Sequence, residues 1–124
     1  MKSTNKSEDT ALLIVNDDKL VCSHLHRVLK TYFDDVLSAR NSAQATEALK
    51  LLKVTHVFCE FDLGPLEPNG FDLIVEWRAA YPEIRRAIVV TDVDTSRVAE
   101  PQEVDAVVLK KGGVQVLLKA LFAH

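Results

Sequence analysis

Short apolar runs alternate with longer stretches of mixed polarity along most of this chain. Four of the runs are rich in β-branched or aromatic residues and are followed by a polar residue; they cover residues 12–15, 57–61, 87–90 and 106–109. Runs of this length and composition predict buried β-strands. The run at 57–61 is followed by Asp62 and then by a loop with Gly, Pro and Asn, which indicates that Asp62 lies at the tip of a strand.

The stretches between these runs carry apolar residues at helical spacing. They predict helices near residues 20–32 and 43–52, from Gly70 to just before Pro82, and over 113–122. Ser42 is predicted as the N-cap of the second helix. Only fourteen residues separate Thr91 from Ala106, and their apolar positions make a poor stripe. A short or irregular fourth helix is therefore predicted there.

The alternation of strands and helices determines the expected fold class. Successive strand–helix units imply parallel strands with helices on both faces of the sheet. We predict an α/β, flavodoxin-like, doubly wound fold with a five-stranded parallel sheet in the order 2-1-3-4-5. A chain of 124 residues makes one domain. Residues 11–124 are predicted to form it, after a flexible leader at residues 1–10.

Polar residues follow four of the predicted strands. They are the cluster Asn16-Asp17-Asp18, then Asp62, Thr91 and Lys110. Because the carboxyl ends of parallel strands meet at one edge of the sheet, these side chains are expected to lie together, where ligands bind in open α/β folds. A carboxylate placed there is a candidate reactive group.

This ordered set resembles the receiver domain of two-component response regulators, of the chemotaxis-receiver kind. The resemblance rests on an acidic cluster after the first strand, Asp62 with Gly70 eight residues on, Thr91 after the fourth strand and Lys110 after the fifth. It covers roughly residues 11–122. It implies a signalling protein of the phosphorelay, not an enzyme. Such a protein accepts a phosphoryl group from a histidine kinase or phosphotransfer protein and alters the binding of a downstream protein partner.

The resemblance also implies a role for each site residue. Asp62 becomes the phosphoacceptor, Thr91 bonds the phosphoryl group and Lys110 pairs with it. The carboxylate and the phosphoryl oxygens repel each other, so a cation is needed, and Mg²⁺ prefers oxygen ligands. The implied Mg²⁺ ligands are Asp17, Asp62, the backbone carbonyl of Gly64 and, weakly or through water, Asn16. No organic cofactor is implied.

Three further acids are not expected to take part in the chemistry of the site. Asp18 is expected to be solvated or to start a helix, and Glu67 is expected to be solvated in its loop. Glu60 is expected to be a strand side chain with no chemistry.

Several positions depart from the family pattern. Asn16 stands where the family usually has an acid, so Mg²⁺ should bind more weakly. Asp92 follows Thr91 where a small residue is usual, Val107 replaces an aromatic residue, and Lys111 replaces a proline. These departures favour an alternative, a degenerate pseudo-receiver that acts as a phosphorylation-independent interaction module.

Two enzyme or cofactor classes fit less well. Phosphatases with an acid nucleophile, which resemble the haloacid dehalogenases, place a second acid two residues after the nucleophile, and that position is Gly64. A flavin-binding flavodoxin needs a phosphate cradle after the first strand, where this chain is acidic.

Composition excludes other classes. The net charge is −3, and no basic patch indicates nucleic-acid binding by this domain. The apolar runs are of strand length and the N-terminus has no apolar core, so neither a membrane span nor a signal peptide is predicted, and the expected location is cytoplasmic. Cys22 and Cys59 lack a pairing or metal-ligand spacing and are expected to pack in the core.

Overall fold

A computed structural model of the chain describes residues 9–92, 95–96 and 98–122. The strands are β1 (Ala11–Val15), β2 (Asp35–Ala39), β3 (His56–Glu60), β4 (Arg86–Thr91) and β5 (Ala106–Leu109). The helices are α1 (Lys19–Leu29), α2 (Ser42–Leu51), α3 (Gly70–Ala80) and α4 (Gly113–Phe122), with a 3₁₀ turn, η2 (Lys110–Gly112), before α4. Residues 1–8 lie outside the described residues, so the predicted leader stays a prediction.

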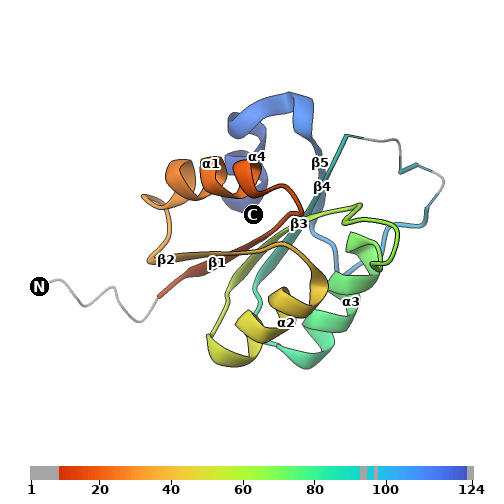
Figure 1. The fold of residues 1–124 in the computed structure, drawn as a ribbon, viewed down its shortest axis with the longest axis horizontal. Coiled ribbons are helices and arrows are strands. Elements are labelled where there is room, and N and C mark those ends of the chain that lie inside the picture. The colour runs from red at the N-terminus through yellow and green to blue at the C-terminus, as the bar shows by residue number, and fades with distance from the viewer. Residues whose placement is uncertain (1–8, 93–94, 97, 123–124) are drawn as a thin grey trace, which may run out of the picture.

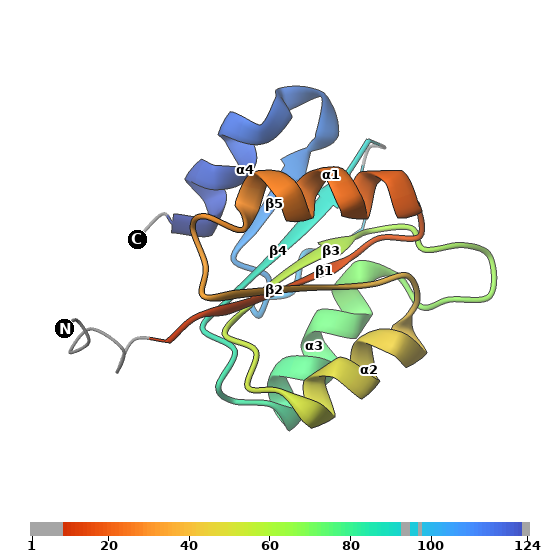
Figure 2. The ribbon, with the colours of Figure 1, turned by 60° about the vertical axis from the view of Figure 1, so that its left-hand side comes forward.

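The strands form one parallel sheet between two layers of helices. Helices α1 and α4 cover one face and α2 and α3 the other (Figures 1 and 2). The strand order is β2-β1-β3-β4-β5, and every neighbouring pair is parallel. The predicted flavodoxin-like fold and its strand order are therefore confirmed. In the described part of the chain, no helix has the length and apolar content needed to cross a membrane.

The core lies in two layers, one on each side of the central strands. Leu13, Val57 and Cys59 pack towards the layer that contains α2 and α3. Leu12 and Phe58 pack towards α1 and α4. A strand buried on both faces must be apolar at nearly every position, which explains the continuous runs in β1 and β3. Both cysteines are buried and unpaired, as expected.

The ends of two helices differ from the prediction. Asn41, not Ser42, is the N-cap of α2: its backbone is extended, and its Oδ1 accepts a hydrogen bond of 2.8 Å from the N–H of Gln44. Helix α1 ends at Leu29, three residues before Tyr32. The predicted bounds of α4 are confirmed.

The fourth crossover, residues 92–105 between β4 and β5, has no helix among its described residues. Arg78 of α3 organises it instead. The Arg78 guanidinium donates to the carbonyl of Glu103 at 2.9 Å and to Asp105 Oδ2 at 2.7 Å. Asp105 Oδ2 also accepts from the N–H of Ala87 at 2.8 Å, which joins the crossover to β4. Where a short or irregular fourth helix was predicted, the described residues therefore form turns and no helix.

Strand β3 ends earlier than predicted, at Glu60. The next carbonyl, that of Phe61, accepts a 2.8 Å hydrogen bond from the N–H of Gly70 instead of extending the strand. The two segments approach so closely that a Cβ on Gly70 would lie 2.9 Å from the Glu60 carbonyl oxygen, so glycine is required there. Asp62 consequently lies two residues beyond the strand, in the loop.

Candidate functional site

Strand register brings the ends of four strands to one edge, which we call the carboxyl edge. Val15 is paired with Cys59, so Asn16 follows β1 at the level of Glu60. Glu60 is paired with Val90, one residue before Thr91, and Thr91 is paired with Leu109, one residue before Lys110. The carboxyl edge therefore collects one polar residue from each of these strands.

An ion pair between Glu60 and Lys110 lies at the carboxyl edge. Lys110 Nζ lies 2.7 Å from Glu60 Oε1; the Glu60 side chain is 4% exposed and that of Lys110 is 38% exposed. Burial raises the pKa of Glu60 above its ordinary value, although the Lys110 ammonium opposes the rise. For Lys110, burial disfavours the charge, yet the hydrogen bond and the negative charge of Glu60 raise its pKa overall. Each partner therefore favours the charged form of the other.

Asn16 completes this cluster from β1. It is buried, and its Nδ2 donates to Glu60 Oε1 at 3.2 Å. Its Oδ1 accepts from the N–H of Asp18 at 2.9 Å, which fixes the orientation of the amide. We call Asn16, Glu60 and Lys110 the Glu60 cluster.

Glu60 is the last residue of β3, as expected for a strand side chain, and it is also the carboxylate that Lys110 contacts. A signal for it existed in the sequence. A charged residue inside a strand that is buried on both faces is rare unless it is paired. Glu60 is the last residue of its strand, whereas the polar residues predicted to form the site follow the strands.

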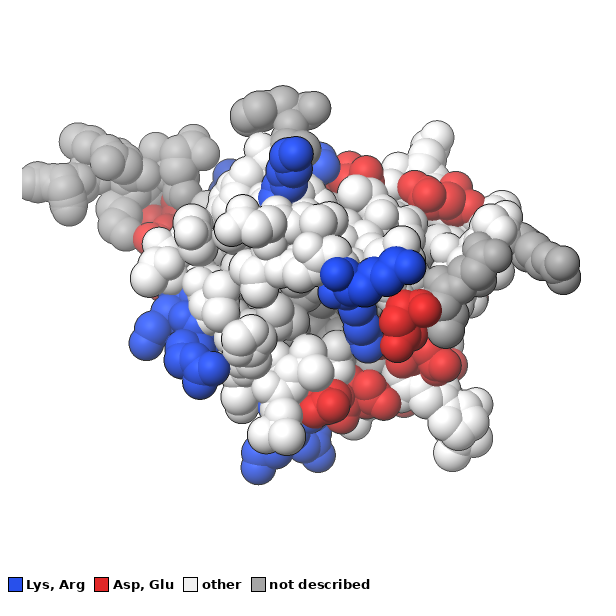
Figure 3. Space-filling model, turned by 90° about the horizontal axis from the view of Figure 1, so that it is seen from above, with Lys and Arg blue, Asp and Glu red and all other residues white. Residues whose placement is uncertain are grey.

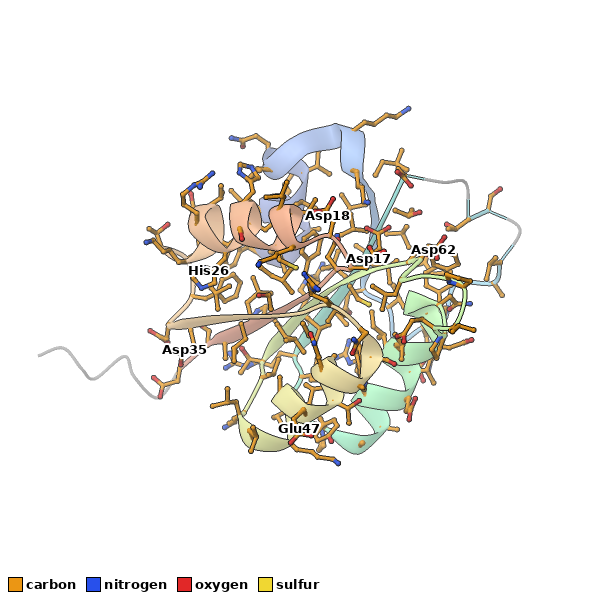
Figure 4. The ribbon with its side chains drawn as sticks, in the orientation of Figure 1. Asp17, Asp18, His26, Asp35, Glu47 and Asp62 are labelled. Carbon is orange, nitrogen blue, oxygen red and sulfur yellow. The ribbon has the colours of Figure 1, made fainter. Side chains whose placement is uncertain are left out.

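Four acids near the carboxyl edge, among them the predicted site acids Asp17 and Asp62, lie at the surface. Asp17, Asp18, Asp62 and Asp92 are all exposed. Figure 3 shows acidic side chains gathered at the end of the molecule where the strands end. Figure 4 shows Asp17 and Asp62 at this same end of the sheet. Asp18 is the N-cap of α1, as expected for a helix-start residue, and its Oδ1 accepts from the N–H of Leu20 at 2.9 Å.

The contact observed for Asp62 is within its own loop. Asp62 Oδ1 accepts a 3.0 Å hydrogen bond from the N–H of Gly64. The Gly64 carbonyl in turn accepts from the N–H of Glu67 at 3.2 Å. Glu67 is expected to be solvated in its loop. In the structure, however, its Oε1 accepts a hydrogen bond of 2.8 Å from the N–H of Ser42, which ties the loop to α2. In the predicted phosphoacceptor loop, the Asp62 and Glu67 carboxylates thus accept hydrogen bonds from backbone N–H groups.

Thr91 ends β4 and is buried, 1% exposed, whereas the neighbouring Asp92 is exposed. The charge of Asp92 acts on both Glu60 and Lys110, raising the pKa of each. Asp92 therefore contributes negative potential at the carboxyl edge. The predicted roles of Thr91 in bonding a phosphoryl group and of Asp62 in accepting it stay predictions.

A cavity of about 300 Å³ opens beside the Glu60 cluster, between α1 and α4. Its walls are mostly apolar, with Asn16, His24 and Lys110 as the polar exceptions. Lys110 thus both pairs with Glu60 and lines this cavity, at the first residue of η2.

Comparison with solved structures identifies the fold. The chain is similar to a response regulator from Burkholderia pseudomallei solved with a phosphorylated aspartic acid, a calcium ion and citrate; identity is 23%, the TM-score is 0.80, and 93% of this chain and 68% of that chain are covered. It is also similar to the signal receiver domain of an HD domain-containing protein from Pseudomonas fluorescens Pf-5, at 22% identity and a TM-score of 0.79 over 92% of both chains.

A third similar structure is the response regulator TrrA from Thermotoga maritima in complex with Mg²⁺ and BeF, at 16% identity, a TM-score of 0.75, and coverage of 89% of this chain and 94% of that chain. Comparison with protein-family models finds no match, and comparison with curated protein sequences finds none either. The chain therefore has the fold of response regulator receiver domains, at low sequence identity.

Proposed function

We propose that this chain is a signalling module of the receiver type that binds its protein partner without needing a phosphoryl group. The observation that carries the proposal is the ion pair between Lys110 Nζ and Glu60 Oε1 at 2.7 Å. By the resemblance, the lysine after the fifth strand pairs with the phosphoryl group. In this chain the corresponding residue, Lys110, is already paired with the buried carboxylate of Glu60.

The energetics of the pair oppose phosphorylation at Asp62. A phosphoryl group there would compete with Glu60, which is 4% exposed, for the Lys110 ammonium. Leaving a buried carboxylate without its partner costs about 3 kcal/mol or more. Glu60 itself is a poor acceptor, because its buried Oε1 is already bonded by Lys110 and Asn16.

The proposal places the module in a two-component pathway as a non-enzymatic component. Its upstream contact is a histidine kinase or phosphotransfer protein, and its output is the binding of a downstream protein. Neither nucleic acid nor membrane is a proposed partner of this domain, and the proposed location is the cytoplasm. These assignments rest on the receiver fold.

A second candidate function is phosphoryl acceptance on Asp62. The exposure of Asp62 and Asp17 at the carboxyl edge favours it, because a small donor can reach both carboxylates. In this alternative Mg²⁺ is held by Asp17, Asp62, the Gly64 carbonyl and, weakly, Asn16. Thr91 and Lys110 would contact the phosphoryl group, as the resemblance implies.

Intact-mass measurement separates the two candidates. The wild type, Asp62→Asn and Glu60→Gln are incubated with MgCl₂ and acetyl phosphate. The proposed function predicts that the wild-type mass stays unchanged, because Lys110 stays with Glu60. Gain of one phosphoryl group by the wild type, lost in Asp62→Asn, would refute it and establish the second candidate. Gain of that group only in Glu60→Gln would support the proposal, since it would show that Glu60 blocks the reaction.

A further inference from the structure

We infer that the Lys110 ammonium and the Asn16 amide N–H together stabilise the Glu60 carboxylate, as a divalent cation stabilises the carboxylates in the site implied by the resemblance. The Glu60 cluster is then complete without a metal ion, and Asn16 is its positioning residue. This inference rests on the proposed function and deepens it, because it states what keeps Glu60 in place.

The orientation of the Asn16 amide is determined by its neighbours. The backbone N–H of Asp18 can only donate, so the Asn16 atom 2.9 Å from it must be the oxygen. The amide nitrogen is then the atom that faces Glu60 Oε1, at 3.2 Å. An amide N–H donates to a carboxylate and cannot bind a cation. Asn16 therefore presents a neutral hydrogen-bond donor where an acid would present a negative charge.

Lys110 provides the second donor to the same oxygen. Its Nζ lies 2.7 Å from Glu60 Oε1, so this oxygen accepts from both Lys110 and Asn16. A carboxylate oxygen offers about two lone pairs. A cation could bind this atom only by displacing one of the two donors.

Three of the other expected ligand oxygens also have partners. Asn16 Oδ1 accepts from Asp18, Asp62 Oδ1 from Gly64, and the Gly64 carbonyl from Glu67, in each case from a backbone N–H. Mg²⁺ requires near-octahedral oxygen ligands at about 2.0–2.1 Å. Among the residues that the structure describes, no three His, Cys, Asp or Glu side chains are grouped so that they could hold a metal ion. The donor set thus suits an internal ion pair and does not suit Mg²⁺.

Replacing Asn16 by Asp converts this arrangement into one that needs a cation. In Asn16→Asp, a second carboxylate faces Glu60 Oε1 at the 3.2 Å contact and repels it. The variant also restores an acid beside Asp17, which makes a set of oxygen ligands that Mg²⁺ prefers. Magnesium should therefore stabilise the variant and leave the wild type unchanged.

The test is thermal unfolding with and without millimolar MgCl₂, followed by the fluorescence of the buried Trp77. The wild-type Tm should not respond to MgCl₂. The Tm of Asn16→Asp should fall by roughly 5 °C without MgCl₂ and recover when it is added. Asn41→Asp is the matched control: it makes the same charge change at the N-cap of α2, where Asp caps as well as Asn, and should show neither effect.

Asn16→Ala keeps the test decisive if Asn16→Asp does not fold. It removes the donor to Glu60 without adding charge, so its Tm should fall and MgCl₂ should not restore it. A wild-type Tm that rises with MgCl₂, or an Asn16→Asp Tm equal to that of the wild type, would overturn the inference. These readouts do not depend on phosphorylation, so a wild type that binds Mg²⁺ but gains no phosphoryl group would refute this inference alone.

Discussion

Two ion pairs in this protein have similar chemistry and very different surroundings. Glu60 and Lys110 meet at the carboxyl edge, where Glu60 is almost fully buried. Arg78 and Asp105 meet at 2.7 Å beside the fourth crossover, with side chains 24% and 26% exposed. Each pair lies where another feature was expected. The Glu60–Lys110 pair lies at the predicted phosphoryl site, and the Arg78–Asp105 pair lies beside the crossover where a fourth helix was predicted.

The two pairs differ in whether water can hydrate the remaining side chain when its partner is removed. Water can hydrate Asp105 and Arg78, so the main loss there is the order of a loop. Water cannot easily reach Glu60, so loss of Lys110 leaves a buried charge. The pair with the buried Glu60 carboxylate should therefore control the stability of the whole domain, and the Arg78–Asp105 pair, in which both side chains are partly exposed, only that of its own segment.

The largest effect is expected from Lys110→Met, which removes the partner of the buried carboxylate. The free energy of unfolding should fall by about 3 kcal/mol. Lys111→Met, at the exposed neighbour, is the control and should change it by less than about 0.5 kcal/mol. Urea unfolding followed by Trp77 fluorescence measures both. Equal losses in the two variants would contradict the importance of the buried pair.

A second large effect is expected from Gly70→Ala, which disturbs the end of β3. The new Cβ would lie 2.9 Å from the Glu60 carbonyl oxygen and 3.1 Å from Phe61 Cα, both backbone atoms that cannot move alone. We expect a loss of about 2 kcal/mol in the free energy of unfolding. In Gly112→Ala, the atoms nearest the new Cβ belong to the half-exposed side chain of Val116. A smaller loss is expected there, and the reverse order would refute this account of the loop.

Arg78→Lys tests the exposed pair. It keeps the positive charge but cannot reproduce the guanidinium contacts with Glu103, Asp105 and the carbonyls of Ile84 and Arg85. The free energy of unfolding should fall by about 1 kcal/mol. Amide hydrogen exchange should become faster at Val104 and Asp105 and stay unchanged in β3. Arg27→Lys, on the exposed face of α1, is the control, and faster exchange throughout the sheet would contradict a local role.

The smallest effect on the free energy of unfolding at neutral pH is expected from replacing His56. In acid, the same replacement should have a distinct effect. Burial, followed by the charges of Arg85 and Arg86, lowers the pKa of His56 from its ordinary 6.5 to about 4. Because the folded pKa is depressed, the unfolded chain binds a proton first as the pH falls. The free energy of unfolding should therefore decrease from about pH 6.5 to about pH 4.

Comparison of pH profiles checks this sign. His56→Gln should lose the part of the slope that His56 contributes between these two pH values. The exposed His24 provides the control, and His24→Gln should keep the wild-type slope. A His56→Gln profile parallel to that of the wild type would show that His56 does not titrate differently in the two states.

Most of the fold was predictable because local sequence and burial agree. The apolar runs of β1, β3 and β4 are buried on both faces, and the short spacing after Thr91 correctly predicted the lack of a regular fourth helix. The N-cap of α2 was misassigned because Asn41 and Ser42 are adjacent and both suit the role. Only the extended backbone of Asn41 decides between them.

The candidate site was less predictable, because contacts between distant segments define it. Phe61 continues the apolar run, and only its hydrogen bond to Gly70 ends β3 one residue earlier. The contact between Glu60 and Lys110 joins two strands that are not neighbours in the sheet. Strand spacing indicated the carboxyl edge correctly but could not decide which of its carboxylates faces the lysine.

The most direct test of the central claim is a double-mutant cycle between Glu60 and Lys110, measured without Mg²⁺ or a phosphoryl donor. Unfolding free energies of the wild type, Glu60→Gln, Lys110→Met and the double variant give the coupling between the two side chains. The ion pair predicts a favourable coupling of about 2 kcal/mol, with the double variant more stable than Lys110→Met. A coupling near zero would show that Lys110 is not bound to Glu60 in the resting protein and would contradict the account.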